Sequence, residues 1–460
     1  MTHALHPVIV GAGPAGVRAA QTLVAHGARP MVIDEAPRWG GQIYRQPPDG
    51  FGRSKQALYG FEAGKADALH GALAQVLDRI DYRPRTLVWS AERGRLDLLG
   101  PQGLGTQAFE HLIVATGGAD RVLPFPGWTL PGVFTLGAAQ VALKFQGCAI
   151  GSRVVLAGTG PLLYLVAWQY AKAGAQVAAV LDTARWGDKL AAAPGMLRQP
   201  ALLAKGLYYM AWLRLHGIAL HQGVRLERAE GPGRVARLHW SDERGAHATE
   251  CDAVGFGYAL RSETQLADLL GCSFTHDPLQ RAALPVRDVG GRSSVPGVYL
   301  AGDGAGIQGA DAAEWAGERA ALALLADAGL SVDPKRTRWL ESQLARTADF
   351  RRSLDRAFPF PADWAARASD DLVVCRCEEV TAGQLRQCVR ESGAREMNRL
   401  KALTRVGMGR CQGRTCGVAA AEILAHACGS TSDAVGRLRG QAPVKPLPVS
   451  VLAAARGEGA

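Results

Sequence analysis

Two glycine-rich turns, each placed between a short apolar run and a segment of helical periodicity, constrain the fold of this chain most strongly. The first turn, Gly11 to Gly16, follows the apolar run Val8 to Val10. The second turn, Gly158 to Pro161, follows the run Val154 to Leu156 at an offset of 147 residues from the first. In both places the helical segment ends at a glycine and a further apolar run follows. This repeat predicts an α/β fold with two doubly wound, Rossmann-like domains, each built on a parallel sheet.

Length and composition limit the number of domains, the class of protein and the kinds of partner. The 460 residues suffice for two or three domains, and 48% hydrophobic residues are typical of a globular protein. The best candidate for a membrane span, Ala201 to Leu220, is interrupted by Lys205, Arg214 and His216, so we expect a soluble helix and no transmembrane segment. The N-terminus lacks a signal-peptide pattern, which predicts a cytoplasmic location. The net charge of +10 comes from scattered basic residues, so we expect no nucleic-acid partner.

The first turn predicts a site for the pyrophosphate of a dinucleotide. Glycines permit the tight turn and let a pyrophosphate approach the N-terminus of the next helix, where free N–H groups favour an anion. A carboxylate at the end of the second strand can accept hydrogen bonds from a ribose, and Asp34 and Glu35 both stand there. The constant offset matches Glu35 with Asp182 of the second unit and therefore favours Glu35. The candidate residues of the turn itself are Gly11, Gly13, Pro14, Ala15 and Gly16.

Two later apolar runs also end in small residues. Leu112 to Val114 leads into Ala115, Thr116 and Gly117, and Val298 to Ala301 leads into Gly302 and Asp303. The order of these elements resembles that of flavoproteins with two dinucleotide-binding domains. The resemblance implies FAD as the cofactor, with the Thr-Gly turn beside it and Asp303 bonded to its ribityl chain.

The segment Gly40 to Arg45 narrows the kind of flavoprotein. Disulfide reductases of this fold need a redox-active cysteine pair near the flavin, but this segment has none and Cys148 is isolated. We therefore do not expect disulfide reduction. The same resemblance implies that Gly41, Gln42 and Arg45 lie against the edge of the flavin.

The second turn departs from the usual pattern at Leu163. A glycine at this position normally permits close packing of the helix on the strand, so the leucine alters any nucleotide site. Two interpretations stay open. Gly158, Gly160 and Asp182 form a site for NAD or another adenine nucleotide, or the unit keeps its fold without binding one.

Four cysteines near the C-terminus form two close pairs, Cys375 with Cys377 and Cys411 with Cys416, separated by 33 residues. Four thiolates in two pairs suit a 2Fe-2S cluster, with one iron held by each pair. A structural zinc site is the alternative, although zinc ribbons prefer two-residue spacing within each pair. The segment resembles 2Fe-2S domains of the bacterioferritin-associated-ferredoxin type, which implies a small helical cluster domain. A capping box at Thr381 predicts one of its helices.

These observations predict five regions. Residues 1–120 with 285–330 form the FAD domain, and residues 121–284 form a second nucleotide-binding-like domain. Residues 331–369 form a helical linker, residues 370–435 the 2Fe-2S domain, and residues 436–460 an extended, proline-containing tail.

As a whole, the chain resembles the FAD- and 2Fe-2S-binding α (A) subunits of hetero-oligomeric dye-linked amino-acid dehydrogenases, which include opine oxidases, D-hydroxyproline dehydrogenase and hydrogen cyanide synthase. The resemblance rests on the four cysteines and on the segments Gly40–Arg45, Ala115–Gly117, Pro126–Trp128 and Gly302–Gly304. It implies a β subunit similar to D-amino-acid oxidase that oxidises the C–N bond, and a small ferredoxin-like γ subunit. This chain would then pass electrons to a quinone or dye, with the complex peripheral at the inner membrane face.

Two other functions remain as alternatives. In the first, the chain is a stand-alone NAD(P)H-dependent reductase in which the second unit delivers hydride to FAD. In the second, a metal-binding interaction module is joined to a flavoprotein that has lost its activity. The intact first turn argues against this non-enzymatic alternative.

Overall fold

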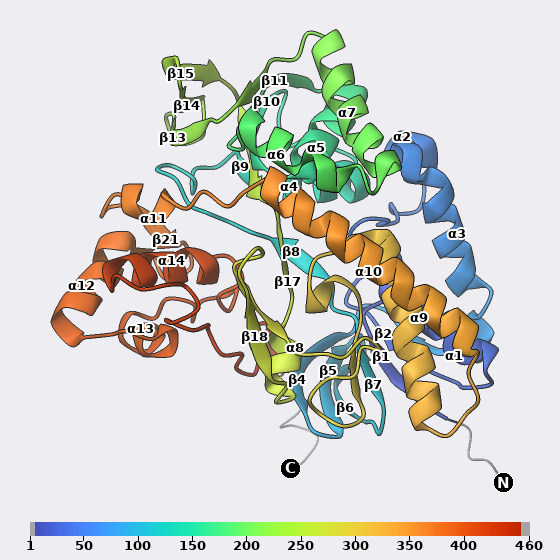
Figure 1. The fold of residues 1–460 in the computed structure, drawn as a ribbon. Helices are drawn as coiled ribbons and strands as arrows, with labels where there is room; N and C mark the ends of the chain where they lie inside the picture. The colour runs from blue at the N-terminus through green and yellow to red at the C-terminus, as the bar shows by residue number, and fades with distance from the viewer. Residues whose placement is uncertain (1–4, 452–460) are drawn as a thin grey trace.

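The computed structural model describes residues 5–451, which form two α/β units, a helical C-terminal region and a long helix that crosses between them (Figure 1). The first unit contains a five-stranded parallel sheet. Its strands are, in spatial order, β20 (Val298–Leu300), β7 (Leu112–Val114), β1 (Val8–Val10), β2 (Met31–Ile33) and β3 (Asp81–Arg83). Because β20 follows the whole second unit in sequence, the first unit is completed only after the second.

Both faces of the first sheet are covered, which explains its short strands of Val, Ile and Leu. Ile9 faces a core shared with helices α1 (Pro14–Ala25), α3 (Ala63–Ala74) and α9 (Ala310–Asp327). Val8 and Val10 face the opposite core, which holds the antiparallel sheet of β4 (Leu87–Glu92), β5 (Arg95–Gly100) and β6 (Gly103–Ala108). Helices α1 and α9 approach closely because Gly317 has no side chain to collide with the backbone of Ala15.

The second unit repeats this plan, which confirms the α/β repeat predicted from the two turns. Its parallel sheet consists of β12 (Leu220–Gln222), β11 (Gln176–Asp182), β10 (Arg153–Thr159), β16 (Ala253–Tyr258) and β9 (Val133–Thr135), in that order. One face packs against α4 (Leu136–Val141), α5 (Pro161–Lys172) and α7 (Pro200–Leu215). The other face packs against the antiparallel sheet of β13 (Arg225–Glu230), β14 (Arg237–Asp242) and β15 (Gly245–Glu250).

Two connections join the units. Strands β8 (Gly118–Asp120) and β17 (Leu260–Ser262) form an antiparallel pair between them. Helix α10 (Pro334–Ala357) crosses the front of the molecule in Figure 1 and contacts α9 of the first unit and α6 (Trp186–Met196) of the second. The predicted helical linker of residues 331–369 thus contains one 24-residue helix.

The C-terminal region is helical and lies at the left of the molecule in Figure 1, below the β13–β15 sheet of the second unit. Its elements are α11 (Trp364–Arg367), β21 (Val373–Cys375), β22 (Val380–Thr381), α12 (Ala382–Ser392), α13 (Met397–Thr404) and α14 (Gly417–Ala427). The capping box at Thr381 begins α12 as predicted. The region shares a buried core with the second unit, and Trp128 Nε1 donates to the carbonyl of Val373 at 2.7 Å.

The segment after α14 returns to the first unit. Asp268 accepts hydrogen bonds from Arg437 and Arg439, and the buried Val444 donates its N–H to the carbonyl of Trp89 on β4 at 2.9 Å. Residues 452–460 of the predicted tail lie outside the described residues. The remaining short elements are α2 (Lys55–Tyr59), η1 (Gly60–Glu62), η2 (Leu77–Arg79), η3 (Ala142–Gln146, a π-helical turn), α8 (Gln265–Leu269), β18 (Phe274–Asp277), β19 (Ala282–Pro285) and η4 (Gly302–Ala305).

Within residues 5–451, no helix is both long and apolar enough to cross a membrane.

Candidate functional site

The first glycine turn lies where β1 meets α1 and is held by close backbone approaches. Gly11 has a φ of +105°, and a side chain there would collide with the carbonyl oxygen of Ala115. A side chain at Gly16 would collide with the carbonyl of Gly11. Gly11 and Gly16 are therefore required by the turn itself, whether or not a ligand is bound.

Gly13 has a different role. A Cβ at this position would meet only the Cα of Gly41, at 3.6 Å, which is an ordinary contact. A Cβ at Gly117 would meet nothing within 4 Å. The backbone thus leaves space at both glycines, and at the start of α1 the N–H groups of Ala15 and Gly16 have no partner within the helix. This space is what an approaching pyrophosphate requires.

The carboxylate nearest this space belongs to Asp34. It accepts hydrogen bonds from the N–H of Ala12 at 2.6 Å and of Ala36 at 2.7 Å. Burial raises the pKa of Asp34 above its ordinary value, against these two hydrogen bonds. Glu35 is exposed and pairs with Lys445 from the C-terminal segment.

Strand pairing corrects the correspondence between the two units. In the first unit Val10 pairs with Ile33, which places Gly11 opposite Asp34. In the second, Gly158 pairs with Asp182, because β11 carries a register shift that a constant offset cannot reveal. Asp182 also accepts from the N–H two residues ahead, at Ala184, as Asp34 does at Ala36. The match of Glu35 with Asp182 is therefore wrong, and Asp34 is the structural counterpart of Asp182.

The carboxyl ends of β7 and β20 lie beside this turn. Thr116 donates its hydroxyl to the carbonyl of Glu263 at 2.6 Å, and Ala115 lies behind Gly11. Asp303, which follows Gly302 after β20, accepts from the N–H groups of Gln308 and Gly309 at the start of α9. The three strand ends thus bring the separate sequence motifs to one edge of the sheet.

The segment Gly40–Arg45 lies over the glycine turn, since a Cβ at Gly41 would come within 2.9 Å of the Cα of Gly13. Arg45 donates to the side-chain oxygen of Gln42 at 2.7 Å, and its guanidinium lies over the ring of Phe145. The Nε of Arg45 is buried and has no hydrogen-bond partner within residues 5–451. A buried donor without a partner fits a bound polar group.

Lys144 of the second unit also reaches this segment. Its side chain is buried and donates to the carbonyl of Ile43 at 3.1 Å. Burial lowers the pKa of Lys144 to about 8. No sequence motif indicated this residue, because it comes from the π-helical turn η3 of the other unit.

In the second unit, the carboxylate at the end of β11 is engaged by side chains of the same unit. Asp182 is fully buried, and Lys189 Nζ lies 2.6 Å from its Oδ2, to which Tyr164 donates its hydroxyl at 2.6 Å. Gln222 donates to the Tyr164 hydroxyl at 2.8 Å. Burial lowers the pKa of Lys189, against the effect of its partner Asp182. Internal groups therefore satisfy the carboxylate that would otherwise accept the hydroxyls of a ribose.

Aromatic rings lie around the Lys189 side chain. The rings of Phe358 and Trp186 lie 5.1 and 5.5 Å from its ammonium. Leu163, a residue of α5, is fully buried in the core. Gly158 and Gly160 have positive φ angles, so the second turn keeps its backbone form while the Asp182 carboxylate is engaged internally.

The four cysteines come together in the C-terminal region. Cys416 is hydrogen-bonded to both Cys375 and Cys411, and Cys377 is hydrogen-bonded to Cys411. The hydrogen bonds to Cys416 lower the pKa of Cys375 to about 6 and that of Cys411 to about 4. Within residues 5–451, no three His, Cys, Asp or Glu side chains converge on one point as ligands of a single metal ion. The thiols form a connected row instead.

Cysteines 388 and 428 take no part in this row. Cys388 is buried in α12, and the thiol of Cys428 donates to the carbonyl of Ala394. Cys388 therefore belongs to the core of the region, and Cys428 is partly buried against that core.

Arginines surround the row of thiols. Arg261 is largely buried near Cys411 and Cys416, and its Nε has no hydrogen-bond partner among the described residues. Arg414 donates to Glu263 Oε2 at 2.7 Å. A concentration of guanidinium groups around thiolates suits a group with negative charge.

One residue connects the two candidate sites. Glu263 donates its N–H to the carbonyl of Gly117 at 2.9 Å and accepts the hydroxyl of Thr116, while its carboxylate receives Arg414 of the cysteine loop. Burial opposes ionisation of Glu263, but Arg414 and Arg261 hold its pKa below the ordinary value. The first dinucleotide-type site and the cysteine loop therefore share a buried, charged contact. Sequence analysis missed Glu263, which belongs to no motif.

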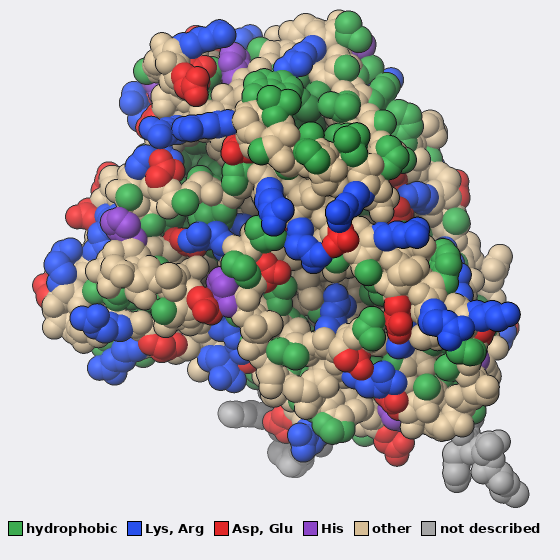
Figure 2. Space-filling view, viewed as in Figure 1, with side chains coloured by type: hydrophobic (Ala, Val, Ile, Leu, Met, Phe, Trp, Pro, Cys, Tyr) green, Lys and Arg blue, Asp and Glu red, His purple; other side chains and the backbone are tan. Residues whose placement is uncertain are grey.

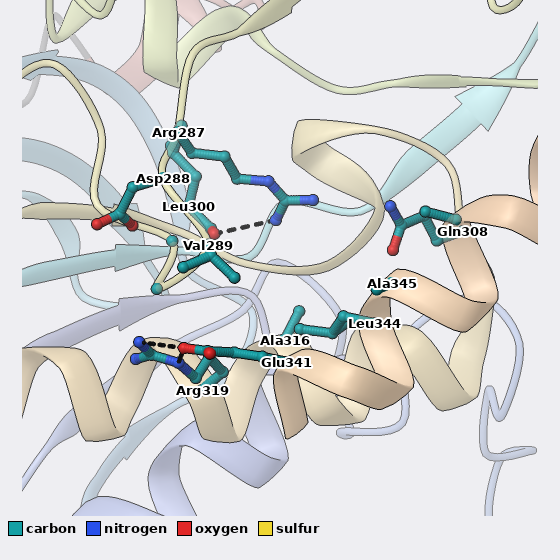
Figure 3. Close-up of a pocket in the computed structure, with 13 residues that line it drawn as sticks. Arg287, Asp288, Val289, Leu300, Gln308, Ala316, Arg319, Glu341, Leu344 and Ala345 are labelled. Carbon is teal, nitrogen blue, oxygen red and sulfur yellow. Dashed lines mark hydrogen bonds and ion pairs between the residues drawn. The ribbon is translucent and has the colours of Figure 1, made fainter. Parts of the chain in front are cut away.

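A separate cavity of about 220 Å³ lies between the 287–291 loop, α9 and α10 (Figure 3). Arg287 donates to the carbonyl of Leu300 at 3.3 Å, and Arg319 pairs with Glu341 at 2.9 Å. None of the candidate cofactor residues lines this cavity.

Comparison with known proteins places this geometry in a family. A family model described as pyridine nucleotide-disulphide oxidoreductase matches residues 5–317. An opine oxidase subunit from Agrobacterium tumefaciens (strain Ach5) is 38% identical, covering 97% of this chain and 91% of that protein. Hydrogen cyanide synthase subunit HcnB of Pseudomonas protegens is 36% identical, covering 97% of each chain. The chain belongs to the family of these oxidase and synthase subunits.

Members of this family are flavin-type oxidoreductases, so the chain is a subunit of an oxidoreductase. The fold agrees, since the crystal structure of L-proline dehydrogenase from P. horikoshii aligns with a TM-score of 0.70 at 20% identity, over 98% of this chain and 79% of that one. A second family model, the sarcosine oxidase A3 domain, matches residues 371–456. That match covers the cysteine region and leaves the identity of any bound metal open.

Proposed function

We propose that this chain is the FAD- and 2Fe-2S-containing electron-transfer subunit of a multi-subunit dehydrogenase that oxidises the C–N bond of an amino acid or opine. Its relatives support this, because they carry the names of subunits of an opine oxidase and a hydrogen cyanide synthase. The partner would be a substrate-oxidising β subunit resembling D-amino-acid oxidase, and the complex would include a small ferredoxin-like γ subunit. Electrons would pass to a quinone or a dye.

The residues around the first turn fit FAD. Gly13 and Gly117 leave room for the dinucleotide, Asp34 offers the carboxylate for the ribose, and Asp303 of η4 is held by the N–H groups of Gln308 and Gly309, just before α9. Bound FAD can accept two electrons together and release them one at a time. Segment 40–45 carries the basic side chain of Arg45, and Lys144 of the second unit donates to its Ile43 carbonyl.

The cysteine region fits a 2Fe-2S cluster better than a single zinc ion. The four thiols of Cys375, Cys377, Cys411 and Cys416 interact with one another, and neither cysteine pair has the two-residue spacing that zinc ribbons prefer. Two irons can share four such thiolates, with two thiolates on each. Arg261 and Arg414 would offset the negative charge of the cluster.

The observation that carries the proposal is the contact through Glu263. It bonds both residues of the Thr116-Gly117 turn and, through Arg414, the loop between Cys411 and Cys416. FAD beside the Thr116-Gly117 turn and a cluster on the loop between Cys411 and Cys416 would be joined by this contact into one path for electrons. In this proposal residues 1–120 and 285–330 hold FAD, and residues 370–435 hold the cluster.

The second unit argues against the stand-alone NAD(P)H reductase. Its ribose carboxylate, Asp182, is paired with Lys189 and buried. Electrons would then have to arrive from another protein chain rather than from a bound nicotinamide. The fold of a nucleotide unit is kept here as a structural scaffold.

The test compares the isolated chain with the complex. The chain alone should reduce no dye with proline, octopine or nopaline, and dye reduction should appear when the β subunit is present. Substrate-dependent dye reduction by the isolated chain would contradict the proposal. So would a purified chain that contains neither flavin nor iron.

A further inference from the structure

Helix α7 has an unusual surface for a helix on the outside of a protein. Its 16 residues carry only two charges, Lys205 and Arg214, and its apolar residues are not confined to one face. Leu207 and Leu215 are 54% and 84% exposed. A helix that is apolar on all sides is normally buried, so we expect another surface to pack against α7.

Neighbouring elements extend the surface. Hydrophobic side chains gather over α7 and the adjoining helices at the upper right of the molecule (Figure 2). Phe61 of η1 contacts Tyr208, with ring centroids 5.0 Å apart. We define the α6–α7 surface by its exposed hydrophobic residues, which are Phe61, Trp186, Leu190, Leu197, Leu202, Leu207, Tyr208 and Leu215. An apolar patch on this scale marks an interaction site.

The charges at this surface favour a protein over a lipid membrane. Lys205 pairs with Glu62, Arg198 with Asp349, and Arg214 lies over the ring of Trp186 at 5.5 Å. These cations are engaged within the chain, so little basic charge remains to bind anionic headgroups. Tryptophan, tyrosine and arginine around leucines match the composition of protein interface centres.

The surface also reaches the candidate flavin site. Lys205 of α7 pairs with Glu62, and Tyr44 of segment 40–45 donates its hydroxyl to the same carboxylate at 2.9 Å. The cysteine region lies on the other side of the molecule, at the left in Figure 1. A partner on the α6–α7 surface would therefore sit near the flavin segment and leave the cluster domain free.

We infer that the α6–α7 surface is the docking face for the substrate-oxidising subunit of the complex. This inference rests on the proposed function and locates the surface of this chain that the partner subunit binds. The partner presents a complementary apolar patch, and its binding buries the exposed face of α7. Electrons enter on this side and leave through the cysteine region.

The test uses the full complex with its cofactors, purified through a tag on this chain, in which mass spectrometry identifies the flavin-bearing partner. The double variant Leu207→Glu/Leu215→Glu should recover at least tenfold less of that partner, while its own flavin content stays unchanged. Val289→Glu, at a site 61% exposed and outside the α6–α7 surface, is the matched control and should assemble normally. A photo-crosslinking residue at position 207, but not at 289, should join this chain to the flavin-bearing partner.

Three results would overturn the docking face alone. The double variant could assemble as well as the wild type, or position 207 could crosslink to a second copy of this chain. The wild type, but not the variant, could also sediment with phosphatidylcholine/phosphatidylglycerol vesicles while both keep the partner. If the wild type itself recovers no flavin-bearing partner, the proposed function fails as well.

Discussion

At the scale of single residues, the glycines of the first turn divide into two kinds. Gly11 and Gly16 are required by the backbone, because side chains there would collide with carbonyl oxygens. A side chain at Gly13 would not collide with the backbone, so the glycine there keeps space free beside the turn. Substitutions at Gly11 therefore test folding, whereas substitutions at Gly13 test binding.

Gly13→Leu should fold like the wild type and contain less than a tenth of its FAD, since the added side chain would fill the open space where the pyrophosphate is expected. Flavin released on denaturation and the thermal melting curve measure both properties. Gly11→Ala should instead lower the free energy of unfolding by at least about 2 kcal/mol, because a strained φ angle and a collision add up. Gly64→Ala, in open space on α3, is the control. A Gly13→Leu protein with full flavin content would contradict this assignment.

The carboxylates at the end of β2 show where sequence reasoning stops. The sequence indicates an acidic residue there, but the constant offset favoured Glu35 over Asp34, because the register shift in β11 is invisible in the spacing. Lys189 and Glu263 were missed for a related reason. Each acts through contacts with residues far away in sequence or on other elements, and neither belongs to a short motif.

At the scale of elements, the cysteine loops and α14 form a unit whose metal content can be separated from the flavin. Cys411→Ser should remove the iron and labile sulfide while FAD stays bound, because the candidate FAD residues lie on other elements. Cys388→Ser should keep the cluster, since that thiol packs inside α12. Iron and sulfide analysis of anaerobically prepared protein gives the answer. Zinc in place of iron in the wild type would contradict the cluster.

Glu263 joins the cysteine loop to the Thr116-Gly117 turn, so its substitution should affect both sites. Glu263→Gln keeps the shape but removes the charge that pairs with Arg414. We expect the flavin to be reduced as before, while electron transfer from the flavin to the cluster slows by about tenfold or more. Rapid-mixing absorbance and EPR of the complex with substrate would follow each carrier. An unchanged rate of electron transfer would show that Glu263 takes no part in the path from the flavin to the cluster.

The C-terminal segment should detach in acid. Burial opposes ionisation of Asp268, but hydrogen bonds from Arg437 and Gly440 hold its pKa below the ordinary value. Because the pKa of Asp268 is lower when the segment is docked, ionised Asp268 stabilises docking at pH values above about 3.9, the pKa of an aspartate in an unfolded chain. This stability is lost as the pH falls below about 4. Hydrogen exchange of residues 436–444, corrected for intrinsic rates, should show loss of protection there. Asp268→Asn should lack that protection already at pH 6, and equal protection in both proteins would refute the interpretation.

At the scale of the whole molecule, the sequence predicted the two α/β units because glycine turns and apolar runs are local signals. It also predicted that the four cysteines act together, which the row from Cys375 to Cys377 supports. It could not predict that the cysteine loop packs on the first unit through Glu263, or that α10 crosses from α9 to α6. Such arrangements depend on long-range packing, which leaves no periodic pattern in one sequence.

The second unit carries the central claim, that electrons reach this chain from a partner subunit and not from a nicotinamide nucleotide. Its turn is intact, but Asp182 is paired with Lys189 and accepts the Tyr164 hydroxyl, and Leu163 replaces the glycine that permits close packing of helix on strand. The most direct measurement is anaerobic, rapid-mixing absorbance of the flavin in the purified chain after addition of NADH or NADPH. The flavin should stay oxidised with both nucleotides and become reduced only when the substrate-oxidising partner and its substrate are added. Rapid bleaching by either nucleotide in the isolated chain would contradict the account.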